Sequence, residues 1–167
     1  EGELVYVSSP IAGELQQLSV RRGDQIAKDA LLFELEREAE RAARSEAEET
    51  LRESKARLDK ATLDYSRAKG LSDKRVISPE DYDSAQQALL AAQHNAAARQ
   101  RSLEQADWRF TQKRQASPVA GLVYDTYFRP GEWVPAGEPI LSLLPPEYMK
   151  VRFFAPESEL GSLQVGT

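Results

Sequence analysis

The feature that most constrains this 167-residue chain is an internal repeat, because residues 9–36 return without gaps as residues 117–144. SPIAG at the start of the first copy returns as SPVAG in the second, and the glycine-acid pair at 23–24 returns at 131–132. Each copy has the features of half a small β-sandwich: a Ser-Pro turn, short alternating strands and a second turn at the glycine.

The two copies are expected to share one core, since a unit of roughly 30 residues buries too little surface to be stable alone. Apolar residues keep their spacing in both copies, so we expect the core to contain Ile26, Leu32, Val134 and Ile140. The sequence therefore predicts one sandwich domain, built from residues 1–36 and 116–145. The segment between the copies must leave this domain and return to it.

That segment predicts a helical hairpin over residues 37–115. From residue 36 to residue 117 there is one glycine and one proline, whereas the rest of the chain has eight of each. Both helix breakers, Gly70 and Pro79, lie near the middle, which predicts a tip at about 70–79. Each arm would have about 35 residues and a length on the order of 50 Å.

Both arms carry apolar residues at alternating spacings of three and four, which is the heptad pattern of an antiparallel coiled coil. The expected seam residues of the first arm are Leu51, Ser54, Leu58, Ala61, Tyr65 and Ala68. Those of the second arm are Tyr82, Ala85, Leu89, Ala92, Ala96, Arg99, Leu103, Ala106 and Phe110.

The second arm has two further features. Ser78, Pro79 and two acids after them have the pattern of a helix start, with a serine cap, proline in the first turn and carboxylates near the helix dipole. Residues 84–98 contain no Asp, Glu, Lys or Arg and are rich in Ala and Gln. Two interpretations of this stretch stay open: it uses good helix formers, or its outer side packs against another protein.

Composition excludes several classes of function. The net charge of −5 argues against binding of nucleic-acid phosphates. No cysteine is present, and His94 is the only histidine, so thiolate or histidine metal clusters and histidine-based triads cannot be built. No glycine-rich phosphate loop appears, and we expect Trp108 and Trp133 to be packing residues. The sequence therefore indicates no enzyme, metal or cofactor.

The two half-motifs resemble those of the biotinyl/lipoyl carrier domain. In carriers, the turn between the halves presents a lysine for the cofactor, and here Arg37 occupies that position. A lipoyl half, a coiled-coil hairpin and a second lipoyl half, in that order, are similar to the periplasmic adaptor proteins of the HlyD family, also called membrane fusion proteins. The resemblance covers nearly the whole chain and implies an α+β fold, a split lipoyl-like β-sandwich with an inserted hairpin. Residues 146–167 are similar to the start of the family's β-barrel domain.

Adaptors that dock on TolC-like outer-membrane channels share a tip pattern of Arg, then Leu four residues later, then Ser seven further. Arg67, Leu71 and Ser78 match this spacing, so the resemblance implies that they contact the channel. Arg67 would supply a forked donor, Leu71 an apolar knob and Ser78 a short polar contact. Capping alone also explains Ser78, and packing in the last turn also explains Leu71.

The resemblance implies an adaptor that links an inner-membrane transporter to a TolC-like channel for drug efflux or secretion. It implies a periplasmic location, anchoring to the inner membrane by a segment absent from this sequence, and a ring that commonly has six copies. The chain opens on Glu1 rather than Met, and we expect it to be a fragment. Two alternatives remain: a biotin or lipoate carrier domain, and a coiled-coil scaffold without a role in export. The exported substrate and the transporter class (ABC, RND or MFS) do not follow from the sequence.

Overall fold

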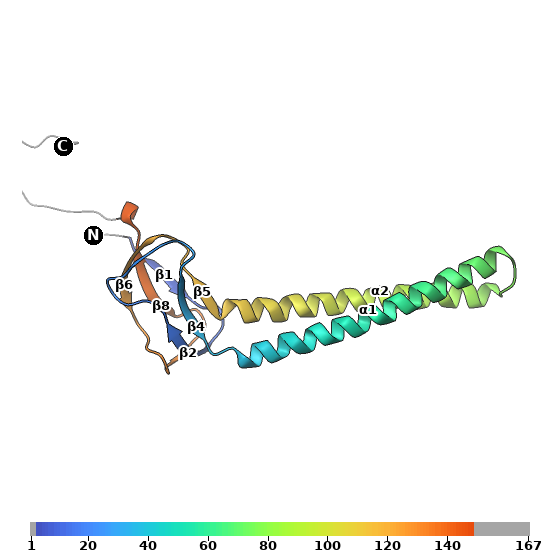
Figure 1. The fold of residues 1–167 in the computed structure, drawn as a ribbon, viewed down its shortest axis with the longest axis horizontal. Helices are drawn as coiled ribbons and strands as arrows, with labels where there is room; N and C mark the ends of the chain where they lie inside the picture. Colours follow the sequence, from blue (N-terminus) through green and yellow to red (C-terminus); the bar gives the residue numbers. More distant parts are fainter. Residues whose placement is uncertain (1–2, 149–167) are drawn as a thin grey trace, which may run out of the picture. The chain divides into compact units, whose positions relative to one another are not determined.

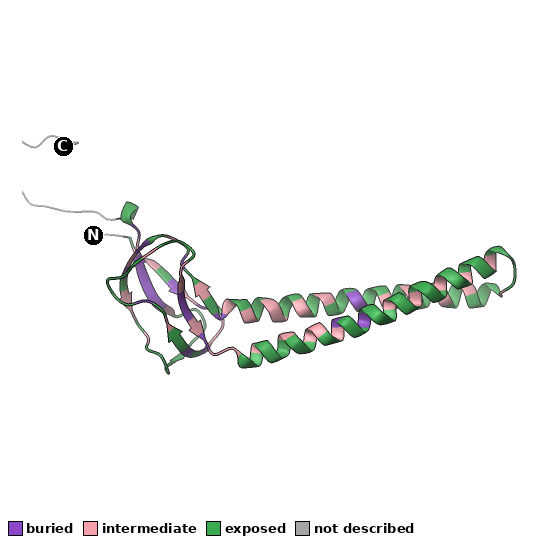
Figure 2. Cartoon of the chain, viewed as in Figure 1, coloured by how far each residue is buried: buried purple, intermediate pink, exposed green. Residues whose placement is uncertain are grey.

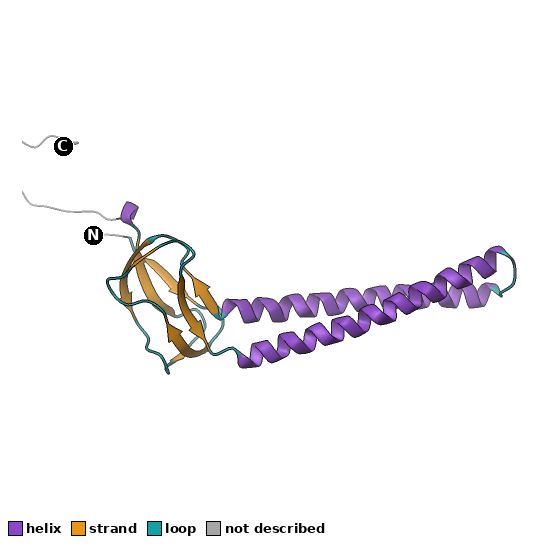
Figure 3. Ribbon diagram, in the orientation of Figure 1, coloured by secondary structure: helices purple, strands orange, loops and turns teal. Residues whose placement is uncertain are grey.

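The computed structural model describes residues 3–148 and contains both β-sheets and two long helices (Figure 1). The described residues form two compact units. One unit contains the residues up to Phe33 and from Ala116 onward, and the other is Glu34–Gln115. The expected α+β class is confirmed, with a β-sandwich and an inserted helical hairpin (Figure 3). The expected start of a β-barrel falls almost wholly on residues 149–167, which lie outside the described residues.

The β-unit has two four-stranded sheets. Strand order in the first is β1 (Val5–Ser8), β8 (Pro139–Leu144), β6 (Gly121–Thr126) and β3 (Gln25–Ile26). In the second it is β5 (Arg114–Ala116), β4 (Leu31–Leu35), β2 (Gly13–Leu18) and β7 (Trp133–Val134). Strands β2 and β3 of the first copy pair antiparallel with β7 and β6 of the second, and β1, just before the first copy, pairs antiparallel with β8. The two copies are therefore interleaved.

Side chains from both copies form the core of this unit, where the buried residues lie along the strands (Figure 2). The side chains with no exposed area include Leu15, Leu32, Phe33, Val123, Val134, Ile140, Leu141 and Leu143. The expectation for Leu32, Val134 and Ile140 is confirmed. Ile26 is only half-buried, because β3 is a two-residue strand at the edge of its sheet.

The repeated residues make matching hydrogen bonds in the two copies. The hydroxyl of buried Ser9 donates to the Ile11 carbonyl at 2.8 Å, and that of Ser117 donates to the Val119 carbonyl at 2.5 Å. The acids after Gly23 and Gly131 each accept from a backbone N–H three residues earlier, at 2.8 Å. Both glycines have φ near +90°, a conformation that side-chain-bearing residues rarely adopt.

Neither half of the sandwich is expected to fold alone, because each contributes only part of the shared core. Residues 1–36 and residues 116–148, expressed separately, should give the circular dichroism and NMR spectra of unfolded chains. Mixing the two peptides tests whether they complement each other. A cooperative unfolding transition from either peptide by itself would contradict the shared core.

The second unit is a helical hairpin of α1 (Glu38–Asp73) and α2 (Pro79–Gln112), with 36 and 34 residues. Helix α2 begins as the sequence predicts: the Ser78 hydroxyl accepts from the Asp81 N–H at 3.1 Å, and Pro79 occupies the first turn. Neither of these helices, within the part of the chain that the structure describes, is long and apolar enough to cross a membrane.

The predicted seam is confirmed with one exception. All the expected seam residues are buried or half-buried except Arg99, which is exposed, whereas Gln100 beside it is half-buried. Arg99 lines a small pocket with the seam residue Ser54, and its charged end stays in water. The Gln100 amide donates to the Glu104 carboxylate at 3.1 Å on the exposed side of α2. Only Leu51, Ser54 and Ala96 are buried, because alanine gives the seam little apolar area per residue.

The expectation that both tryptophans pack inside is wrong. Trp108 is 50% exposed and Trp133 is 67% exposed. Trp108 lies two residues from both Ala106 and Phe110, which places it on the side of α2 opposite the seam. Trp133 lies on the two-residue edge strand β7. His94 is exposed.

Candidate partner-binding site at the hairpin tip

The tip is a short turn between the end of α1 at Asp73 and the start of α2 at Pro79. Two backbone hydrogen bonds close it: the Arg75 N–H donates to the Ser72 carbonyl at 2.8 Å, and the Val76 N–H donates to the Leu71 carbonyl at 2.9 Å. Arg75 has a positive φ of 57°, which reverses the chain direction. The tip therefore has a defined backbone conformation.

Arg67 and Leu71 lie one helical turn apart and so share a face of α1. The Arg67 side chain is 71% exposed, and its Nη1 is 3.3 Å from the Asp64 carboxylate. An exposed ion pair of this kind contributes little free energy, so the guanidinium is available to another acceptor. Leu71 is 41% exposed, an apolar side chain open to solvent.

Ser78 is exposed on the other side of the turn, at the N-cap of α2. Its hydroxyl accepts from the Asp81 N–H and lies 2.7 Å from the Asp81 carboxylate. Ser78 therefore caps α2, and its side chain is also accessible to a partner. Packing in the last turn of α1 does not bury Leu71, which stays exposed.

Val76 is a tip residue that the expected three-residue pattern does not contain. It is 66% exposed, and its N–H bonds to the Leu71 carbonyl. Leu71 at the end of α1 and Val76 in the turn are thus two exposed aliphatic side chains at the tip. The sequence signal for Val76 was the aliphatic pair Val76-Ile77 between Arg75 and Ser78. Leu71 and Val76 offer a partner a small apolar contact beside Arg67.

A tyrosine pair joins the two arms behind the tip. The hydroxyls of Tyr65 and Tyr82 are 3.0 Å apart, and the ring centroids are 5.7 Å apart. The hydrogen bond with Tyr65 raises the pKa of Tyr82, with desolvation as a second cause. The pair thus joins Tyr65 of α1 to Tyr82 of α2 next to the tip.

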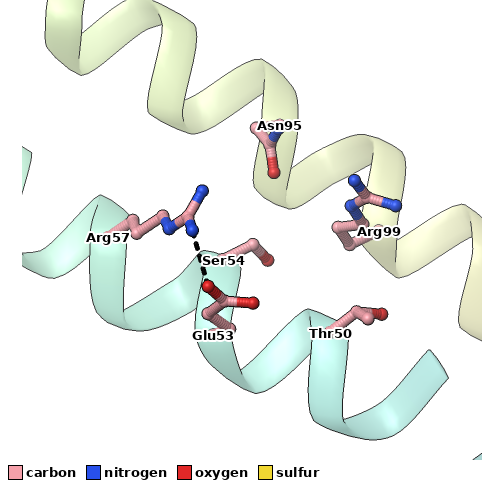
Figure 4. A pocket seen from close by; sticks show the side chains of 6 residues that line it. All are labelled: Thr50, Glu53, Ser54, Arg57, Asn95 and Arg99. Atoms are coloured by element: carbon pink, nitrogen blue, oxygen red, sulfur yellow. Dashed lines mark hydrogen bonds and ion pairs between the residues drawn. The ribbon is translucent and has the colours of Figure 1, made fainter. Parts of the chain in front are cut away.

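The middle of the hairpin has a small polar pocket, shown in Figure 4, with a volume of about 70 Å³. It is lined by Thr50, Glu53, Ser54, Arg57, Asn95 and Arg99. Arg57 is bound to Glu53 at 2.6 Å, and the Ser54 hydroxyl donates to the Leu51 carbonyl. Pockets for drug-sized ligands are typically about 300–1,000 Å³, so this one suits a single side chain rather than a transported molecule.

A network of charges holds the other end of the hairpin. Lys113 is 5% exposed, and its ammonium lies 2.8 Å from both the Glu40 carboxylate and the Glu36 carbonyl. Arg37 is bound to Glu34 at 2.8 Å and stacks over the ring of Phe110 at 4.5 Å. Arg37 occupies the position of the lysine in carrier domains. Its side chain is held by Glu34 and Phe110 and is not presented to solvent.

Comparisons with known proteins agree with this geometry. Residues 43–113 match the family described as RND MFP, alpha-helical hairpin domain. The chain is 26% identical over 164 residues to the uncharacterized protein YdhJ of Escherichia coli (strain K12), covering 98% of this chain and 57% of that protein. It is 26% identical over 161 residues to the multidrug resistance protein MdtA of Yersinia pestis (strain Pestoides F), covering 95% of this chain and 36% of that protein.

Among solved structures, the fold is similar to the membrane fusion protein Spr0693 of Streptococcus pneumoniae R6, with a TM-score of 0.69 and 16% identity. That match covers 98% of this chain and 70% of the other. The hairpin is similar to that of the RND membrane fusion proteins, and the described chain has the fold of a membrane fusion protein. The family model and the fold both agree with the resemblance to membrane fusion proteins that the sequence predicted.

Proposed function

We propose that this chain is a periplasmic adaptor that links an inner-membrane transporter to a TolC-like outer-membrane channel in drug efflux or secretion. The observation that carries the proposal is the accessible tip, where Arg67, Leu71 and Ser78 match the docking pattern in spacing and are all exposed. The name of MdtA as a multidrug resistance protein supports efflux as the kind of process.

The mechanism we propose is structural rather than catalytic. Residues 1–36 and 116–145 form a lipoyl-like domain that stacks with other copies into a ring, commonly of six. The hairpins of residues 37–115 line up as a tube, and their tips meet the channel. Inner-membrane anchoring completes the bridge between the two membranes. The part of the chain that the structure describes has no group of three or more His, Cys, Asp or Glu residues placed to hold a metal ion.

A carrier of biotin or lipoate is the second candidate, suggested by the resemblance of the two half-motifs to the biotinyl/lipoyl carrier domain. Acylation needs a lysine that an attaching enzyme can reach, whereas Arg37 is an arginine and its side chain is only 16% exposed. Mass spectrometry of the native protein distinguishes the two functions. We expect the unmodified mass, and a biotin or lipoyl adduct would favour the carrier.

A coiled-coil scaffold without a role in export is the third candidate. The test is a pull-down from detergent-solubilised envelopes with the tagged protein as bait. We expect a TolC-like channel and an inner-membrane transporter in the eluate, and loss of the channel with a tip variant. Recovery of neither membrane protein would favour the scaffold.

A further inference from the structure

The small pocket in the middle of the hairpin lies where the seam carries polar residues (Figure 4). Ser54, which is 5% exposed, occupies a seam position of α1, and its side chain fills less space between the arms than a leucine would. Asn95 and Arg99 of α2 line the pocket from the other helix. Polar groups between two helices need hydrogen-bond partners, so a pocket of this kind takes up water or an ion rather than an apolar group.

The charges that line the pocket favour an anion. Arg57 of α1 and Arg99 of α2 supply two positive charges, and Glu53 supplies one negative charge, which leaves a net charge of +1. Glu53 is bound to Arg57 at 2.6 Å, whereas Arg99 has no acidic partner among residues 3–148. The pocket is therefore positive although the whole chain has a net charge of −5.

The pocket also offers more hydrogen-bond donors than acceptors. A guanidinium has several N–H groups, and the contact with Glu53 uses only part of those of Arg57. The amide of Asn95 adds further N–H donors. The Ser54 hydroxyl donates to the Leu51 carbonyl at 2.8 Å, but a helical carbonyl also accepts a backbone N–H, so the hydroxyl can turn to another acceptor at little cost. A ligand with many acceptor oxygens fits these donors.

The volume of the pocket fits a small ion. It is about 70 Å³. A single water needs about 10–15 Å³ in the same measure, so the pocket has room for roughly five groups of that size. Phosphate and sulfate each consist of a central atom and four oxygens. Their oxygens point in several directions, which allows contacts with both arms, and guanidinium groups bind such oxyanions well.

We propose that this pocket binds a free tetrahedral oxyanion, phosphate or sulfate, between Arg57 of α1 and Arg99 of α2. Asn95 and the Ser54 hydroxyl supply the remaining donors. The bound anion links the two arms at mid-length, so the stability of the hairpin rises with the concentration of phosphate or sulfate. This inference goes beyond the adaptor role and does not depend on it.

The anion site is separate from the tip. Arg57 precedes Arg67 by ten residues on α1, a distance of about 15 Å along the helix. Docking through Arg67 therefore does not use the anion, and export does not report on the anion site. Its test requires a direct measurement of binding.

A phosphate titration followed by NMR measures binding directly. Sodium phosphate is added to the purified protein while sodium chloride keeps the ionic strength constant. The amide signals of Ser54 and Asn95 are expected to move along a saturating curve, and sodium sulfate should give the same result. Arg99→Gln is expected to weaken phosphate binding at least about tenfold, the usual effect of losing a hydrogen bond to a charged group.

The matched control is Arg101→Gln. Arg101 is an exposed arginine of the same helix that does not line the pocket, so this variant loses the same charge and should keep the affinity of the unaltered protein. Circular dichroism confirms that both variants remain helical.

Thermal unfolding provides a second measurement. Phosphate and sulfate stabilise many proteins by exclusion from the surface, so the informative quantity is the difference in Tm shift between the unaltered protein and its variants. Phosphate should raise the Tm of the unaltered protein and of Arg101→Gln more than that of Arg99→Gln. Ser54→Leu places a seam leucine in the pocket and should reduce the phosphate effect in the same way.

Three results would each overturn the anion site: NMR signals that move without saturation, equal weakening of binding by Arg101→Gln, or a full phosphate effect on Tm in the Ser54→Leu protein. Loss of saturable binding in a protein that docks normally on its channel would overturn the anion site alone. Saturable binding in a protein that never binds a channel would support the anion site and overturn only the adaptor role.

Discussion

Arg67→Asp is expected to abolish export while leaving helicity and thermal stability nearly unchanged. The Arg67 side chain is 71% exposed and makes one long ion pair, so its loss removes little folding free energy. At a docking surface the same change replaces a forked donor with a carboxylate, which repels the acceptors that the arginine would bind. Drug-susceptibility or secretion assays measure export, and circular dichroism of the purified variant measures folding.

The matched control is Arg57→Asp, because Arg57 lies on the same helix, is 72% exposed and also has an ion pair with a nearby acid. This variant is expected to keep export. Leu71→Ser should behave like Arg67→Asp, whereas Ser78→Ala combines any lost contact with a lost helix cap of about 1 kcal/mol. Normal export by the Arg67→Asp protein, or equal loss of export in the Arg57→Asp protein, would contradict docking through Arg67.

Lys113→Met is expected to destabilise the protein by about 3–5 kcal/mol, the usual cost of removing one partner of a buried ion pair. The methionine fills a similar volume, but it leaves Glu40 at 18% exposure without the ammonium and the Glu36 carbonyl without its donor. Urea unfolding followed by circular dichroism measures the change in the free energy of unfolding.

Arg114→Met is the control for this experiment. Arg114 is the next residue, its side chain is 53% exposed, and its nearest carboxylate oxygen, on Glu34, is 3.9 Å away. We expect a loss of less than about 1 kcal/mol from this change, as for other surface pairs. A similar loss from both variants would show that the Lys113 network is no more important than an ordinary surface charge.

Much of the fold follows from local patterns in the sequence. The repeated Ser-Pro and glycine-acid turns specify the same hydrogen bonds in both copies, as the Ser9 and Ser117 hydroxyls show. The absence of helix breakers and the heptad spacing specify the two helices and the side on which they meet. These features depend on residues close together in the sequence, which is why they can be read from it.

The structure differs from the sequence-based expectations at Arg99 and at the two tryptophans. Arg99 fits the heptad spacing and lines a pocket with Ser54, but it stays exposed because desolvating its charge is costly. Trp108 and Trp133 have the composition of core residues, yet one lies on the outer side of a helix and the other on an edge strand. Hydrophobicity alone does not decide burial when the backbone fixes the direction of the side chain.

The candidate site was predicted in part. The spacing of Arg67, Leu71 and Ser78 locates the tip, and the structure adds that all three are accessible. Val76, the Tyr65–Tyr82 pair and the Lys113 network depend on which residues the turn and the antiparallel register bring together. Lys113 and Glu36, for example, are bound across 77 positions of the sequence. Such contacts follow from the register of the two arms. Counting both seams outward from the tip pairs Tyr65 with Tyr82, and this pairing indicates the register.

Photo-crosslinking from the tip tests the central claim most directly. A photoreactive amino acid placed at Leu71, in cells that produce the protein together with its export system, is expected to give a covalent adduct with the TolC-like channel. The same residue placed at Ala56, an exposed position in the middle of α1, should give no channel adduct. A protein that exports normally but forms no channel adduct from Leu71, or forms it equally from Ala56, would contradict docking through the tip.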